Sequence, residues 1–209
     1  MLRLFVAIGL PEPVQLELAC LERGIPGARW IPSDNLHLTL RFIGEVNEGL
    51  AEDAASALAH VRAPAFEMTL AGVGHFGPLQ KASSVWAGVE PCPPLTRLRD
   101  NVESALVRAG FRPEGRKFKP HVTLARIRGE TGHHLANFLA EHNTFRHGPM
   151  TVSSFSLFVS HLSRSGAIYE KAETYWLAGA PPEVDDGDEE ETGEEEAGVQ
   201  GFAARRARM

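Results

Sequence analysis

The sequence predicts an α+β protein with two pseudo-symmetric lobes, each a mostly antiparallel β-sheet backed by helices, enclosing a central cleft. First, strand-like and helix-like segments alternate along residues 1–179. Second, the tetrad His, apolar, Thr, Leu occurs twice, in "NLHLTLRF" (35–42) and again 84 positions later in "KPHVTLAR" (119–126). Each tetrad lies in a predicted strand that precedes a helix and another strand, which favours two related halves over a doubly wound parallel sheet.

The first elements follow from simple periodicities. Residues 2–8 alternate as a strand, and residues 12–24 form a helix that opens after Pro and closes at Gly. Residues 36–44 are a strand with the first tetrad. An Asn-capped, Ala-rich helix is expected at 47–62, and a strand at 66–76.

The remaining elements repeat this order. A strand is expected at 83–90, and the long amphipathic pattern of 93–111 predicts a helix begun by Pro. The second tetrad lies in a strand at 121–127, followed by a shorter helix at 133–143. A β-hairpin closes the fold, with strands at 150–162 and 167–177.

Charge divides the chain into two parts. Residues 180–209 hold ten Asp and Glu against three Arg and one aromatic residue, so we expect a disordered acidic tail with a short basic end. A solubilising role for this tail is favoured over a regulatory or partner-binding one. Residues 1–179 hold 18 Lys and Arg against 17 Asp and Glu, and we interpret them as one bilobal domain that can accept a phosphate ligand without a long nucleic-acid track.

Several classes of protein are disfavoured. The two cysteines form no C-x-x-C motif, and apolar runs such as 4–10 are too short to span a membrane. The cysteine usage and the lack of a recognised targeting leader lead us to expect a cytoplasmic protein with no membrane contact. We also expect a monomer, although the sequence does not fix the oligomeric state. No metal site and no cofactor are expected, because the remaining histidines lack metal-ligand spacing and no H-E-x-x-H occurs.

The tetrads predict a shared polar site. Alternate side chains of a strand share a face, so His37 points with Thr39 and His121 points with Thr123, while the Leu and Val positions between them face the core. If the halves are related by two-fold symmetry, the polar faces line opposite walls of one cleft. The plainer alternative is that each His is a half-buried strand residue satisfied by a neighbouring hydroxyl.

This set of groups suits the hydrolysis of a strained cyclic phosphodiester. One neutral imidazole can take a proton from water while a charged one gives a proton to the leaving oxygen. Threonine hydroxyls can hold the non-bridging oxygens, and an arginine can stabilise the charge that develops on them.

The segments "RWIPSDNLHLTLRFIGEV", "KFKPHVTLARI" and "FSLFVSHLSRSGAIYEKAETYWL" resemble the two-histidine phosphoesterase superfamily, in its RNA 2′,3′-cyclic phosphodiesterase branch, also called the 2′-5′ RNA ligase family. The resemblance covers residues 1–178. It implies metal-independent opening of a terminal RNA 2′,3′-cyclic phosphate to a 2′-phosphomonoester, together with 2′-5′ RNA ligation. The implied catalytic residues are His37, Thr39, His121 and Thr123, with His37 as acid and His121 as base, although the reverse assignment stays open.

Three further residues are substrate-binding candidates. The resemblance implies that Arg126 contacts phosphate, but strict alternation places it on the wrong face unless a bulge intervenes. Arg41 alternates in phase with His37, and its alternative is an exposed strand charge. Phe76, in a Gly-rich segment expected to be flexible, is placed to stack on a terminal base.

Two other functions remain open from the sequence. A non-catalytic module that binds RNA ends would need only anchoring groups, and a metal-dependent phosphodiesterase would need clustered Asp and His. In the favoured reading, the partners are RNA termini or nucleotides with a 2′,3′-cyclic phosphate.

Overall fold

The computed structural model describes residues 1–130, 132–162 and 167–180. The acidic segment 181–209, expected to be a disordered tail, lies outside the described residues. The helices are α1 (Glu12–Ala19), α2 (Glu48–Ala59), α3 (Pro93–Arg108) and α4 (Gly132–Glu141). The strands are β1 (Leu2–Gly9), β2 (Arg29–Trp30), β3 (His37–Val46), β4 (Phe66–Phe76), β5 (Ser84–Val89), β6 (His121–Arg126), β7 (Arg146–Val152), β8 (Ser154–Leu162) and β9 (Ala167–Trp176).

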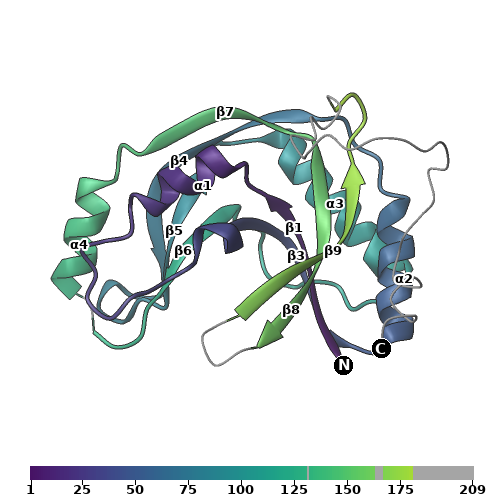
Figure 1. Cartoon of the computed structure of the whole chain (residues 1–209), viewed down its shortest axis with the longest axis horizontal. Coiled ribbons are helices and arrows are strands. Elements are labelled where there is room, and N and C mark those ends of the chain that lie inside the picture. The colour runs from purple at the N-terminus through teal and green to yellow at the C-terminus, as the bar shows by residue number, and fades with distance from the viewer. Residues whose placement is uncertain (131, 163–166, 181–209) are drawn as a thin grey trace, which may run out of the picture.

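The expected α+β class is confirmed, with antiparallel strand pairing throughout the named strands (Figure 1). The described strands form one 9-stranded sheet in the order β7-β4-β5-β6-β3-β1-β8-β9, with β2 attached to β6. The sequence predicts a separate sheet in each lobe. In the structure the two groups of strands are joined where β3 meets β6, through the single pair Leu38–Val122.

The chain does not build its two halves one after the other. After β3 it crosses to form β4, β5, β6 and β7, and it then returns to place β8 and β9 beside β1. The expected strand at 150–162 is therefore two strands, because β7 pairs with β4 and β8 pairs with β1. The apolar positions change phase at Ser153 and Ser154, from Met150 and Val152 to Phe155 and Leu157, and this shift marks the break that a single strand at 150–162 overlooks.

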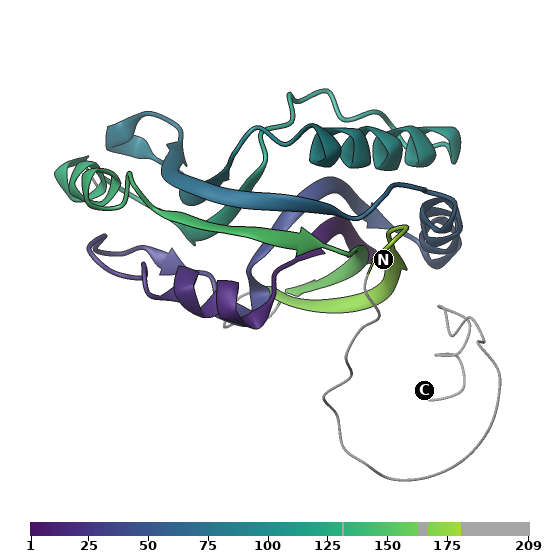
Figure 2. The same cartoon turned by 90° about the horizontal axis from the view of Figure 1, so that it is seen from above.

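The helices form for the reasons that their sequences indicate. The Asn47 side chain accepts a hydrogen bond from the Leu50 amide at 2.9 Å, which caps α2 as expected. Helix α3 begins at two prolines and buries a stripe of apolar residues, namely Leu95, Leu98, Val102, Ala105 and Leu106. Helices α2 and α3 lie side by side, and Figure 2 shows α1 and α3 on opposite sides of the strands.

The two tetrad strands share one burial pattern. Leu38, Leu40, Val122 and Leu124 are all at most 3% exposed and belong to the core, while the His and Thr positions between them are half-buried. The alternation expected from the sequence therefore holds over the first four residues of each strand.

Candidate active site

The structure brings the two tetrads together on neighbouring strands. The antiparallel Leu38–Val122 pair sets His37 level with Thr123 and Thr39 level with His121. Because Leu38 and Val122 point into the core, the four polar side chains lie on the other face of the sheet. A local two-fold relation thus passes through the Leu38–Val122 pair.

All four side chains line one cavity of about 770 Å³. Its walls come from both groups of strands and from the segment before β6, and they include Arg126, Phe76, Tyr169 and Lys119. A volume of this size lies within the range of ligand-binding pockets and accommodates a nucleotide.

Each imidazole is oriented by a carbonyl two residues earlier in the chain. His37 Nδ1 lies 2.7 Å from Asn35 O, and His121 Nδ1 lies 2.6 Å from Lys119 O. A carbonyl can only accept, so Nδ1 is the donor in both rings and Nε2 is left to exchange a proton with a ligand.

Aromatic rings surround both imidazoles. His37 packs against Phe5 at 4.9 Å between centroids, and Tyr169 meets it edge-on at 5.1 Å. Phe76 meets His121 edge-on at 4.9 Å, and Trp86 lies 6.1 Å away. The rings restrict the imidazoles sterically and remove part of their hydration.

This environment lowers the pKa of both imidazoles below the ordinary 6.5. Burial is the largest cause in each ring, the backbone hydrogen bonds raise the pKa in part, and the charge of Arg126 lowers it further. His121 is the smallest of the causes that lower the pKa of His37, and Lys119 is a further cause of the lowered pKa of His121.

Arg126 reaches the cavity because β6 contains a bulge. Trp86 pairs with Thr123, but the next residue of β5, Val85, pairs with Ala125, so Leu124 is an extra residue. The bulge shifts the alternation by one position and returns Arg126 to the face of Thr123. Strict alternation along the strand places Arg126 on the wrong face unless a bulge intervenes, and β6 contains such a bulge.

An equivalent bulge in β3 has the opposite effect on Arg41. Ala7 pairs with Thr39 and Val6 with Arg41, so Leu40 is extra and Arg41 leaves the face of His37. The expectation that Arg41 lies on the same face of the strand as His37, which made it a candidate phosphate ligand, is therefore wrong. The position equivalent to Arg126 is taken by Phe42 instead.

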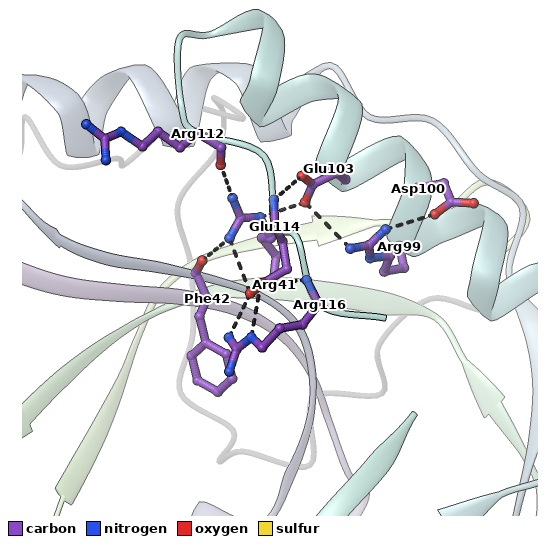
Figure 3. Close-up of polar contacts among 8 residues, drawn as sticks. All are labelled: Arg41, Phe42, Arg99, Asp100, Glu103, Arg112, Glu114 and Arg116. Carbon is purple, nitrogen blue, oxygen red and sulfur yellow. Dashed lines mark hydrogen bonds and ion pairs between the residues drawn. The ribbon is translucent and has the colours of Figure 1, made fainter. Parts of the chain in front are cut away.

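Arg41 is committed to other partners, although it contributes to the cavity lining. Its side chain is 8% exposed, and Nε lies 2.6 Å from Glu103 Oε2 on α3. The guanidinium also donates to the carbonyls of Phe42 and Arg112 (Figure 3). It is a buried structural cation rather than the exposed strand charge that was the alternative.

Phe76 lies at the end of β4, not in a flexible loop. Its ring contacts His121, and Lys119 Nζ lies 5.4 Å from it and 4.3 Å from the Trp86 ring. Phe76 therefore borders the cavity and supports an imidazole at the same time. Its predicted stacking on a base stays a prediction.

Reasoning from the sequence misses several cavity residues, among them Tyr169 and Phe42. The pattern of the closing hairpin indicates a packing role for Tyr169, yet this residue lies edge-on to His37 in the cavity wall. Phe42 has no sequence signal, because only the bulge at Leu40 turns it to the cavity.

The described residues contain no group of three or more His, Cys, Asp or Glu side chains that could hold a metal ion. Among the same residues, no helix has the length and apolar character needed to cross a membrane.

Comparisons with known proteins identify the family. A family model described as the 2′-5′ RNA ligase superfamily matches residues 11–164, and the chain belongs to this family. A relative from Aeropyrum pernix, named RNA 2′,3′-cyclic phosphodiesterase, is 41% identical over 149 residues, which are 70% of this chain and 84% of the relative. A protein of the same name from Thermotoga maritima is 32% identical over 81% of this chain and 92% of its own length.

Solved structures show the same fold. Escherichia coli LigT complexed with 3′-AMP superimposes with a TM-score of 0.67 at 26% identity, covering 85% of this chain and 98% of LigT. A protein from Thermus thermophilus gives a TM-score of 0.65 at 27% identity, over 84% and 97% of the two chains.

Proposed function

We propose that the protein hydrolyses the 2′,3′-cyclic phosphate at RNA ends to a 2′-phosphomonoester, without a metal ion. The observation that carries the proposal is the pairing of His37 and His121 across one cavity, each with Nδ1 fixed by a carbonyl and Nε2 left for the ligand. The relatives named RNA 2′,3′-cyclic phosphodiesterase support the same activity.

The two imidazoles divide the proton transfers. His121 Nε2 takes a proton from water, whose oxygen attacks phosphorus, and the bond from phosphorus to the 3′ oxygen breaks as His37 gives that oxygen a proton. The 2′ phosphate and a 3′ hydroxyl result. The assignment follows the family resemblance. Burial lowers the pKa of an imidazole and encloses His37, between Phe5, Phe158 and Tyr169, more than His121, so burial by itself favours the reverse roles.

The same displacement accounts for ligation. When a 5′ hydroxyl of a second RNA replaces water, the phosphorus keeps its bond to the 2′ oxygen and a 2′-5′ linkage forms. Water as the nucleophile gives hydrolysis and a 5′ hydroxyl gives ligation, and the same two histidines transfer the protons in both reactions.

Thr39, Thr123 and Arg126 hold the phosphate. The two hydroxyls lie level with the two imidazoles across the strand pair and can donate to non-bridging oxygens. Arg126 lies close enough to both rings to lower their pKa, so its charge also acts on a phosphate between them. We do not include Arg41 among the phosphate ligands.

The state of the protein in the cell remains a prediction. We retain residues 1–179 as the functional unit, acting as a cytoplasmic monomer on RNA termini or nucleotides that end in a cyclic phosphate.

The proposal is tested by turnover of an RNA with a 2′,3′-cyclic phosphate in excess EDTA. We expect hydrolysis to a 2′-phosphate, unaffected by the chelator and lowered by at least about 100-fold in His37→Ala and in His121→Ala. His60→Ala is the matched control, because this exposed imidazole also contacts a carbonyl through Nδ1, 2.7 Å from Ser56 O, but is not among the residues that line the cavity.

Other outcomes would favour the alternatives. Turnover that requires added metal would support a metal-dependent phosphodiesterase. Binding of the RNA end with no turnover would support a non-catalytic module.

A further inference from the structure

The cavity extends well beyond the two histidines. It follows β3 from His37 past Phe42 to Gly44, a length of about 20 Å for a strand with a rise of about 3.3 Å per residue. We call the far part the distal arm and define it by Arg3, Phe42, Gly44, Arg116, Lys117 and Phe118. A single phosphate and its nucleoside leave room in such a cavity.

The cavity is strongly cationic, although residues 1–179 are nearly neutral. Among the described residues that line it, seven are Lys or Arg and one, Glu114, is acidic. In the distal arm, Arg3 and Arg116 form ion pairs with Glu45 and Glu114. The two arginine side chains are 47% and 76% exposed, and the two carboxylates are 57% and 20% exposed. The Arg3–Glu45 pair is exposed on both sides and contributes little stability, so a phosphate can replace this carboxylate at low cost. The Arg116 guanidinium is itself exposed to solvent beside its pair with Glu114.

Phe42 adds an aromatic surface to these charges. Its side chain is 49% exposed, and it occupies the position on β3 that Arg126 occupies on β6. An exposed ring beside cations is the combination with which proteins hold single-stranded nucleic acid, since bases stack on the ring and phosphates contact the charges. The local symmetry is thus broken, with a cation on one side and a ring on the other.

The wall of the distal arm is fixed before a ligand arrives. Residues 111–120 contain no helix or strand, but side chains anchor them (Figure 3). Arg41 donates to Arg112 O, and Glu103 Oε1 accepts from the Glu114 amide at 2.8 Å. An ordered wall reduces the entropy lost on binding.

We infer that the distal arm binds the nucleotide on the 5′ side of the terminal one, with its base on Phe42 and its phosphodiester at Arg116 and Lys117. The inference rests on the proposed function, because the cyclic phosphate must lie between the histidines. It makes an RNA end, rather than a free cyclic mononucleotide, the preferred substrate.

The test compares adenosine 2′,3′-cyclic phosphate with the dinucleotide ApA that ends in a 2′,3′-cyclic phosphate, both with the full chain. We expect kcat/KM to be at least about tenfold higher for the dinucleotide. Phe42→Ala should lower the ratio of the two values, because the stacking contribution is lost, and Phe42→Tyr should retain it. The double variant Arg116→Ala, Lys117→Ala should lower the ratio and weaken its dependence on salt, since fewer phosphate contacts remain.

Trp176→Ala is the matched control, because Trp176 is also an aromatic residue that is 49% exposed but is not among the cavity-lining residues. The ratio of kcat/KM for the dinucleotide to kcat/KM for the mononucleotide should be the same in Trp176→Ala as in the wild type. Equal kcat/KM for the two substrates in the wild type would overturn the inference, as would a ratio that survives Phe42→Ala. An equal fall for both substrates in Phe42→Ala would place the terminal base on Phe42 and would also overturn it. No turnover of either substrate would instead refute the proposed function.

Discussion

At the residue scale, the two imidazoles are held alike but surrounded differently. Each donates from Nδ1 to a carbonyl two residues earlier, at 2.7 Å for His37 and 2.6 Å for His121. Their neighbours differ, with Phe5 and Tyr169 against one ring and Phe76 against the other. The two imidazoles therefore share one orientation of their ring nitrogens but differ in their aromatic neighbours.

The lowered pKa values predict an acidic optimum. The pKa of each imidazole is lowered from the ordinary 6.5, chiefly by burial, and we expect a bell-shaped profile of kcat/KM centred between the two pKa values. We therefore expect its maximum below pH 6.5 in a series of initial-rate measurements. Arg126→Met should lower kcat/KM and move the maximum to higher pH, because the cation that opposes imidazolium formation is lost.

Arg128→Met is the control for this shift, since Arg128 is an exposed cation close in sequence that is not among the cavity-lining residues. A maximum that stays in place in Arg126→Met would contradict the assigned position of Arg126.

The sequence predicts the catalytic face but only part of its surroundings. Strand alternation places His37 with Thr39 and His121 with Thr123, because side-chain direction is regular over three residues. Beyond the third residue, the bulges at Leu40 and Leu124 determine which face of the sheet each side chain occupies. They turn Arg41 away from the face of His37 and turn Arg126 toward the cavity. No local sequence signal marks these bulges, and strand pairing reveals them.

At the scale of elements, the buried pair of Arg41 and Glu103 joins three parts of the site. Arg41 lies on β3 with His37, Glu103 lies on α3, and both hold the segment that leads to Lys119 and His121 (Figure 3). The side chains of the pair are 8% and 15% exposed. A cation placed this deeply depends on its partners.

Removing either side chain of the Arg41–Glu103 pair should therefore lower the stability of the fold. We expect Arg41→Met to lower the free energy of unfolding by about 3 kcal/mol, measured by urea denaturation, because the buried Glu103 carboxylate loses its nearest cation. Arg146→Met is the control, since the Arg146–Glu90 pair is exposed and should contribute less than about 1 kcal/mol. Similar losses in the two variants would show that the Arg41 network is not a structural anchor.

The periodicity of the sequence predicts the helices well but does not predict which strands pair. All four expected helices are present, with ends that differ by up to five residues, as at α1, which stops at Ala19. The Asn47 cap and the prolines of α3 have local signals, and both agree with the structure. The phase of the apolar positions shifts between Val152 and Phe155 and marks the end of β7, but the strands with which β7 and β8 pair are set by distant residues.

At the scale of the whole molecule, the chain crosses between its halves to assemble one site. The strands of the tetrads are far apart in sequence and adjacent in space, joined by Leu38 and Val122. Charge is also distributed unevenly over the molecule. Residues 1–179 are nearly neutral as a whole, but cationic side chains gather in the cavity. The repeat of the tetrads predicts a separate sheet in each lobe, but it determines only the local symmetry of the site.

The most direct test of a shared site is an NMR titration of the imidazole resonances, assigned with His37→Ala and His121→Ala, in the absence and presence of adenosine 2′-phosphate. The anion favours the charged form of any imidazole that it contacts. We predict that the pKa values of His37 and His121 both rise when this product analogue binds, while that of His60 is unchanged. A rise at one ring alone, or at neither, would contradict the claim that both histidines act on one phosphorus.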